Sequence, residues 1–257
     1  MKKPKIIDVD GRNVETTGFF CYMSKPKTEG FRRKLAWLKA RFAEGMRIKM
    51  YELPERGFIE YIPGEHAWRA VRAPGYMLIH CLWVVGRSKG RGLGGRLLEE
   101  CLRDAQDAGM KGVAMVTSEK TWLAGSALLL KHGFECADEI PPFRLVVKKF
   151  ETTPSPSFPR DWDDRAKRFG NGLSVMRTDQ CPYIPDAVKH ALDAAKRAGV
   201  KARVVELASA REIRESSPTP YGVFALVFDG RLLSYSYMLP KDLQAVLAEG
   251  RPSPRRS

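Results

Sequence analysis

A glycine-rich segment, RSKGRGLGGRLL at residues 87–98, constrains the fold of this chain more than any other stretch. It follows the apolar run YMLIHCLWVV at 76–85, which predicts a buried strand, and it opens a helix predicted to end near Ala108. A strand that turns through glycines into a helix is typical of α/β proteins. Because glycine has no Cβ, a phosphate can approach the backbone N–H groups at the start of such a helix. The segment therefore predicts a phosphate-binding site.

The other segments before residue 150 predict a mixed sheet. A helix is expected at about 29–45, and the turn LPERG joins strands at 46–52 and 57–62 into a hairpin. Three further elements are a strand at 112–117, a helix at 122–132 and a strand at 143–149. Strands that alternate with helices after a hairpin indicate an α/β fold with parallel and antiparallel pairs.

Composition argues against several classes of protein. No apolar run approaches the ~20 residues that span a bilayer, and no signal-peptide core follows the N-terminal lysines, so we expect a cytoplasmic protein. The five cysteines have irregular spacings that fit neither a disulfide framework nor a zinc site. A net charge of +14 attracts polyanions, nucleic acid among them. No recognised nucleic-acid-reading motif accompanies the basic residues, so that partner is not favoured.

The glycine segment resembles the signature of the GNAT superfamily of acetyl-CoA-dependent acyltransferases, Gln/Arg-x-x-Gly-x-Gly/Ala between a central strand and a helix. The literal match is residues 87–92, but the register 89–94 is favoured because Leu97 and Leu98 then follow at the family's spacing. The resemblance implies that the amides of residues 89–95 hold the pyrophosphate of coenzyme A. It also implies an oxyanion-stabilising N–H near residues 82–84. The implied cofactor-binding residues are Leu82, Trp83, Val84, Lys89, Gly90, Arg91, Gly92, Leu93, Gly94 and Gly95.

A second family element covers the end of a helix. The stretch ALLLKHGFE supplies its Lys-x-Gly-Phe pattern, so the resemblance extends over about residues 45–150. Two positions depart from it: Leu129 replaces a tyrosine that protonates the leaving thiolate in many relatives, and Trp122 replaces a common asparagine. Candidates for that proton are therefore Ser118, Tyr76 or a water molecule.

Acetyl transfer to an amine also requires a proton acceptor. A lysine-like amine with a pKa of ~10.4 costs about 4.6 kcal/mol to deprotonate at pH 7, and a positioned base reduces this cost. His80 on the central strand and Glu60 on the hairpin are the candidate catalytic bases. For each of them a purely structural role is the competing interpretation.

Proline-rich residues 151–171 predict a linker between a domain at 1–150 and a smaller one at 172–250, before a basic tail at 251–257. The smaller domain predicts the element order β-α-β-α-β-β-α, which resembles thioredoxin. Within it, DQCPYIPD stands where glutaredoxins carry Cys-Pro-Tyr-Cys, with Ile184 at the second cysteine position. Cys181 is expected to cap a helix and to have a lowered pKa. Pro218 and Pro220 are candidates for the cis-proline of thioredoxin-like proteins.

The two predicted domains, together with CYMSK, EYIPGEHAWRAV and IHCLWVVG, resemble the YoaP-type acetyltransferases over nearly the whole chain. The leading hypothesis is acetyl transfer from acetyl-CoA to the amine of an unidentified small molecule or peptide. The alternative is a monothiol, thioredoxin-like protein that uses Cys181 for thiol chemistry, with the first domain only binding an acyl-CoA. Nucleic-acid binding through the basic residues is a third hypothesis.

Overall fold

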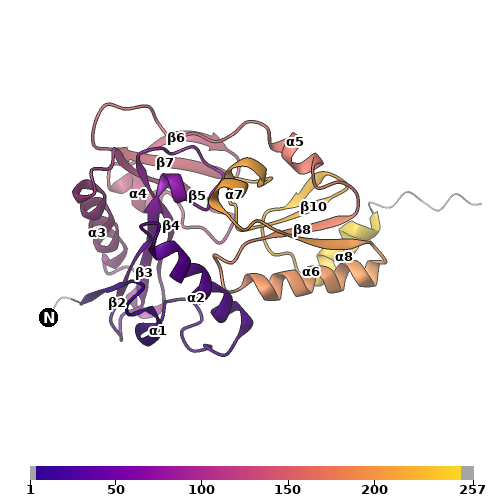
Figure 1. The fold of residues 1–257 in the computed structure, drawn as a ribbon, viewed down its shortest axis with the longest axis horizontal. Helices are drawn as coiled ribbons and strands as arrows, with labels where there is room; N and C mark the ends of the chain where they lie inside the picture. The colour runs from indigo at the N-terminus through magenta and orange to yellow at the C-terminus, as the bar shows by residue number, and fades with distance from the viewer. Residues whose placement is uncertain (1–3, 250–257) are drawn as a thin grey trace, which may run out of the picture.

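Each of the two predicted domains supplies one β-sheet in the computed structural model, which describes residues 4–249 (Figure 1). The first sheet has the strand order β1-β2-β3-β4-β5-β7-β6. Its strands are β1 (Ile6–Val9), β2 (Arg47–Tyr51), β3 (Gly57–Pro63), β4 (Tyr76–Val84), β5 (Gly112–Thr117), β6 (Glu135–Ile140) and β7 (Phe143–Lys149). Strands β4 and β5 are parallel, whereas the other neighbours are antiparallel, which confirms the mixed sheet.

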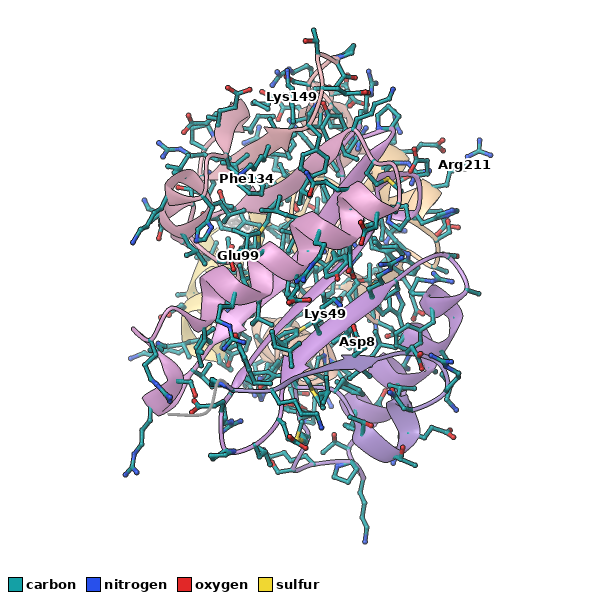
Figure 2. All side chains as sticks on the ribbon, turned by 90° about the vertical axis from the view of Figure 1, so that its left-hand side faces the viewer. Asp8, Lys49, Glu99, Phe134, Lys149 and Arg211 are labelled. Atoms are coloured by element: carbon teal, nitrogen blue, oxygen red, sulfur yellow. The ribbon has the colours of Figure 1, made fainter. Side chains whose placement is uncertain are left out.

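Helices cover both faces of this sheet. Helix α3 (Leu93–Asp107) crosses one face of the sheet (Figure 2). Its Leu97 and Leu98 are fully buried. Together with Leu93, Cys101 and Ala105, which recur every four residues, they form the apolar stripe that the helix buries against the sheet. The other face packs against α1 (Val14–Thr17), α2 (Glu29–Phe42) and the C-terminal part of the chain, on the side away from α3 (Figure 1). None of the described helices is long and apolar enough to cross a membrane.

Several elements differ from the sequence-based expectation, among them the short helix α1, which was not predicted. Strands β1 and β6 were not predicted, because β1 has four residues and β6 carries three acidic side chains at the edge of the sheet. The helix expected at 122–132 is shortened to α4 (Ala127–Lys131). The Glu119 carboxylate accepts a hydrogen bond from the Ser126 amide at 3.2 Å, and a Cβ at Gly125 would lie 2.2 Å from this carboxylate. This local packing keeps the preceding residues out of the helix.

The second sheet has the order β11-β10-β8-β9, with β8 parallel to β9 and the other neighbours antiparallel. Its strands are β8 (Leu173–Arg177), β9 (Ala202–Glu206), β10 (Phe224–Phe228) and β11 (Arg231–Ser234). The helices are α6 (Ile184–Ala198), α7 (Ala210–Ser216) and α8 (Pro240–Glu249), so the predicted element order is present. The cis-proline expectation was wrong, because within residues 4–249 the cis bonds precede Pro54 and Pro142 rather than Pro218 or Pro220.

The two sheets share a hydrophobic core. Residues 151–171, expected to be a linker, contain α5 (Trp162–Lys167) and bury Phe158 and Phe169. A Cβ at Gly222 would lie 3.2 Å from the backbone of Trp68, so the C-terminal part contacts the first sheet directly. The domain boundaries stay a prediction, and the basic tail at 251–257 lies outside the described residues.

Candidate functional site

A cavity of about 440 Å³ opens where β4 leads into α3; we call it the glycine-loop cavity. Strand β4 pairs with β5 only from Tyr76 to Ile79, although both strands continue, so they splay apart beyond that point. The splay leaves the β5 side of residues 82–84 open to this cavity. All of the implied cofactor-binding residues except Arg91 line it.

The loop that forms this cavity depends on glycine at two kinds of position. Gly90 and Gly92 have φ angles of +75° and +73°, which favour glycine, and Gly92 is the N-cap of α3. A Cβ at Gly94 would lie 3.0 Å from Leu128, and one at Gly95 would lie 2.8 Å from His132. Glycine therefore lets the start of α3 pack tightly against α4. The first amides of α3 have no acceptor inside the helix and are available to an anion.

Two residues of the expected phosphate cradle already make polar contacts within the protein. The Lys89 amide donates to the Gly86 carbonyl at 3.2 Å, so this N–H is already used within the loop. The Arg91 guanidinium lies 2.6 Å from the Glu55 carboxylate, and Arg91 does not line the glycine-loop cavity. The side chain of Arg91 is therefore not part of the cavity wall, whereas its expected contribution, the backbone amide, stays a prediction.

The candidates for protonating the thiolate lie at different places. The Tyr76 hydroxyl donates to the Pro154 carbonyl at 2.8 Å, at the opposite end of β4 from the glycine loop, which argues against Tyr76. Ser118 lines a separate cavity of about 290 Å³. Leu129 is fully buried in the wall of the glycine-loop cavity and has no proton to give.

On the other face of the sheet, a β-bulge positions the two candidate bases. Glu60 pairs with Cys81 and Tyr61 pairs with Ile79, so His80 is the extra residue in β4. A bulge interrupts the alternation of side chains between the two faces of the sheet. His80 and Cys81 therefore both lie on the face toward the C-terminal part. Glu60 lies beside them, with its carboxylate 3.6 Å from His80 Nδ1.

His80 is not placed to act as a general base. Its side chain has no exposed surface, and its Nε2 accepts a hydrogen bond from the Trp68 amide at 3.0 Å. The neutral ring then carries its proton on Nδ1, facing Glu60, so no lone pair is free for a substrate. Burial lowers the pKa of His80 to about 4, although Glu60 opposes this effect. The expectation of a catalytic His80 is therefore corrected to a structural one.

Glu60 is ionised and paired. Its carboxylate lies 2.6 Å from Lys34 Nζ on α2, and both side chains are at most 4% exposed. Burial alone would raise the pKa of Glu60, but Lys34 and the nearby His80 outweigh it and lower the pKa to about 2. A carboxylate with so low a pKa is a weak proton acceptor but a permanent negative charge.

The low pKa of His80 predicts acid sensitivity. Below pH 6.5 the unfolded chain binds a proton at this residue, while the folded chain resists it down to about pH 4, so stability falls as the pH drops through this range. We expect a loss of about 2–3 kcal/mol between pH 6.5 and 4.5. The variant His80→Gln keeps an acceptor for the Trp68 amide. In urea unfolding it should lose most of this dependence of the unfolding free energy on pH. An unchanged dependence would contradict the assignment.

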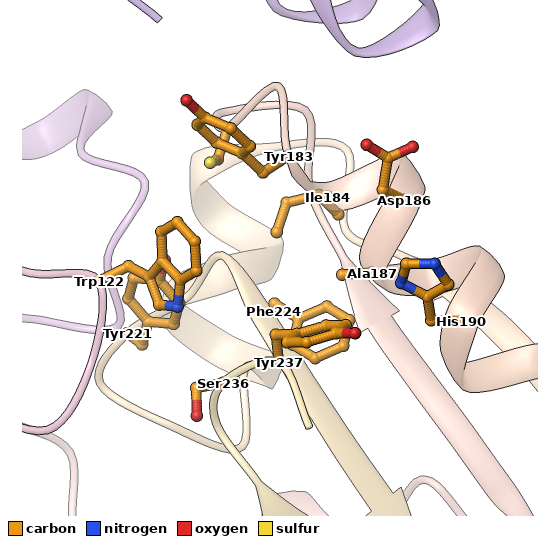
Figure 3. A pocket seen from close by; sticks show the side chains of 11 residues that line it. Trp122, Tyr183, Ile184, Asp186, Ala187, His190, Tyr221, Phe224, Ser236 and Tyr237 are labelled. Carbon is orange, nitrogen blue, oxygen red and sulfur yellow. The ribbon is translucent and has the colours of Figure 1, made fainter. Parts of the chain in front are cut away.

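Glu60 borders a second cavity, of about 320 Å³, which we call the inter-sheet cavity. The first sheet contributes Phe58, Cys81 and Trp83, and the C-terminal part contributes Cys181, Tyr183 and Tyr221. A smaller cavity of about 210 Å³ adjoins it, and the two share Cys181, Trp122, Tyr183 and Tyr221 (Figure 3). Trp83 lines both the inter-sheet and the glycine-loop cavity, so the two meet where β4 and β5 splay.

Sequence reasoning missed several residues of the inter-sheet cavity. Arg69, Gln180 and Tyr221 line it, and Lys34 stands behind Glu60. An arginine inside the apolar run AWRAV was the one local signal for Arg69. The others come from segments that only the tertiary fold brings together.

Cys181 does not have the environment that was expected. Helix α6 begins at Ile184 with Tyr183 as its N-cap, so Cys181 precedes the cap. Burial raises the pKa of the Cys181 thiol, and a hydrogen bond from the Tyr183 amide offsets only part of this effect. The thiol is therefore protonated near neutral pH, opposite to the expected thiolate.

Alkylation kinetics test this correction within one protein. Cys136 is exposed and serves as the internal reference. With iodoacetamide at pH 7.5, we expect Cys181 to react at least about 10-fold more slowly than Cys136, measured by peptide mass spectrometry. Faster labelling of Cys181 than of Cys136 would restore the thiol-handling hypothesis.

Comparisons with known proteins agree with the motifs. The model of the acetyltransferase (GNAT) family matches residues 24–134. The chain is 32% identical over 239 residues to the N-acetyltransferase YoaP of Bacillus subtilis, covering 90% of this chain and 94% of that protein. Among solved structures, the Salmonella typhimurium acetyltransferase YncA with acetyl-CoA has a TM-score of 0.43 at 15% identity, covering 60% of this chain and 98% of that one. The N-acetyltransferase PaiA of Thermoplasma acidophilum with coenzyme A has a TM-score of 0.39 at 13% identity, covering 58% of this chain and 100% of that one.

The family model and the curated relative define an N-acyltransferase. The chain belongs to the GNAT family of acetyltransferases. As a member of that family it uses acetyl-CoA as its cosubstrate.

Proposed function

We propose that this enzyme acetylates the amine of a small acceptor molecule that binds in the inter-sheet cavity. One observation carries the proposal: the glycine-loop cavity and the inter-sheet cavity lie on opposite faces of the first sheet and share Trp83. Acetyl-CoA bound in the first cavity could pass its thioester through the splay between β4 and β5. An amine in the second cavity would then meet the carbonyl carbon.

On the cofactor side, we assign the pyrophosphate to the loop at residues 90–95 and the start of α3. The positive φ angles of Gly90 and Gly92 and the free first-turn amides support this assignment. The N–H groups on the β5 side of residues 82–84 would stabilise the oxyanion, since β5 does not pair with them.

The reaction requires one bond to form and one to break. The amine nitrogen attacks the thioester carbonyl, the new C–N bond replaces the C–S bond, and the proton that the amine loses balances the one that the departing sulfur gains. Of the three predicted catalytic residues, Glu60 is the one that both lines the acceptor cavity and is ionised. Lys34 already balances its charge, so we assign Glu60 the role of accepting a hydrogen bond from the amine and orienting it toward the thioester.

The C-terminal part, we further propose, is a thioredoxin-like domain that has become a wall of the acceptor site. Its element order, its sheet order and the position of Cys181 just before α6 support this likeness. The raised pKa of Cys181 argues against thiol chemistry in that wall. The alternative of a thiol-handling protein is therefore not favoured.

The direct test is calorimetric titration of the protein with acetyl-CoA, followed by incubation with a panel of primary amines. Released coenzyme A and the acetylated amine should appear in equal amounts by mass spectrometry. A protein that does not bind acetyl-CoA would contradict the proposal.

A further inference from the structure

Arg69 is a buried cation without a carboxylate partner. Its side chain lies between the two sheets, lines the inter-sheet cavity and is only 2% exposed. Among residues 4–249, no carboxylate lies within 4.0 Å of its guanidinium. Buried arginines in proteins are normally paired, because an isolated buried charge costs several kcal/mol.

The hydrogen bonds of Arg69 leave part of the guanidinium free. Nη1 donates to the Trp68 carbonyl at 2.9 Å and to the Gln180 side chain, and Nη2 donates to the His80 carbonyl at 2.7 Å. Nε has no partner. Of the five N–H donors of an arginine, three are therefore used by neutral oxygens and two are left over. Two donors are the number that a carboxylate accepts in a bidentate pair.

Glu60, the other charged residue that lines the cavity, is already paired. Lys34 and Glu60 form an ion pair, and His80 is neutral near pH 7 because its pKa is about 4. Arg69 therefore leaves one uncompensated positive charge beside the inter-sheet cavity. A ligand with a single negative charge would supply the missing counter-charge.

The rest of the cavity wall is mainly aromatic. Phe20, Phe58, Trp83, Trp122 and Tyr221 line it, and the Arg69 guanidinium lies 5.7 Å from the centre of the Tyr221 ring. Such walls select flat, apolar groups, while the few polar groups orient the ligand. One arginine suits a carboxylate better than a phosphate dianion, which carries a second charge.

We infer that the inter-sheet cavity binds a small aromatic molecule with a carboxylate, held by Arg69 and surrounded by the aromatic side chains. This inference rests on the proposed function in one respect: the ligand is the acceptor, so it also carries the amine that is acetylated. The acceptor class is therefore an aromatic amino acid or a related amino carboxylate.

Matched ligand pairs test the carboxylate without acetyl-CoA. The full-length protein is titrated calorimetrically with L-phenylalanine, 3-phenylpropionate and indole-3-acetate, each compared with its primary amide. We expect at least one carboxylate to bind at least about 10-fold more tightly than its amide. Equal affinities, or no binding of any carboxylate, would overturn the inference. Because no acetyl-CoA is present, failure of the proposed acyl transfer would not affect this result.

Arg69→Gln separates recognition from a structural role. If Arg69 holds the carboxylate, the variant should lose the preference and bind acid and amide within about 2-fold of each other, whereas Arg69→Lys should keep a reduced preference. If Arg69 only ties Gln180 to the first sheet, the affinities for the acid and the amide should fall equally. The preference for the acid would then persist, which would overturn the inference. Thermal melting checks that each variant is folded, and the wild-type preference stands as a test by itself.

Discussion

Replacing Gly92 with Asp should weaken acetyl-CoA binding by at least about 100-fold, measured by calorimetric titration. Gly92 caps α3 at the mouth of the glycine-loop cavity, and a Cβ there would meet no atom within 4 Å, so the new side chain has room. Its negative charge would stand where the pyrophosphate is expected. Two like charges about 4 Å apart repel by about 4 kcal/mol near a protein surface, which exceeds the free energy of a 100-fold loss.

Two control variants isolate the charge from backbone strain. Gly92→Asn introduces a side chain of the same shape without the charge, and asparagine tolerates a positive φ. Gly109→Asp places the same side chain at a φ of +66°, just after the other end of α3. We expect Gly92→Asn to lose much less affinity than Gly92→Asp and Gly109→Asp to bind like the wild type. Equal losses in Gly92→Asn and Gly92→Asp would show that charge at this position is irrelevant.

The Lys34→Met variant should lose about 3–5 kcal/mol of unfolding free energy, because it leaves the Glu60 carboxylate buried without its cation. Methionine keeps the apolar stem of Lys34 but loses its contact with the Trp37 ring, whose centre lies 4.3 Å from Nζ. Urea unfolding at pH 7 measures the loss. The variant should also raise the pKa of Glu60, since Lys34 is the main cause of its lowering.

The double variant Lys34→Met/Glu60→Gln provides the decisive comparison. With both charges removed, no unpaired ion remains, and we expect the double variant to recover at least half of the single-variant loss. If the losses of unfolding free energy from the two substitutions simply add, Lys34 and Glu60 do not stabilise the fold as an ion pair. Lys89→Met, on the exposed glycine loop, controls for the loss of a lysine as such.

The sequence was sufficient to predict the elements with strong periodicity. Strand β4 and helix α3 follow from the apolar run and the glycine segment alone, and the hairpin of β2 and β3 follows from its turn. Strand β6 could not be predicted, because its acidic residues gain a strand conformation only by pairing with β7. In the same way, a single carboxylate, that of Glu119, decides where α4 begins.

The glycine loop was found because its chemistry is local: consecutive backbone amides need only glycines and a helix start. The catalytic candidates were harder, since their properties depend on distant partners. The Trp68 amide occupies the lone pair of His80, and Lys34, twenty-six residues from Glu60, sets the charge of that carboxylate. Burial, which no local pattern around Cys181 reveals, reversed the expected direction of its pKa.

The inter-sheet cavity takes its walls from both halves of the chain, and Arg69 reaches Gln180 across the junction. In the proposed acceptor site, selectivity therefore depends on both halves of the chain and not on the acyltransferase half alone. Substitutions at Tyr183 or Tyr221, which lie far beyond the glycine loop in the sequence, are expected to change which amines are acetylated while leaving the cofactor loop untouched. A search for the natural acceptor should accordingly compare relatives by the cavity-lining residues of both halves.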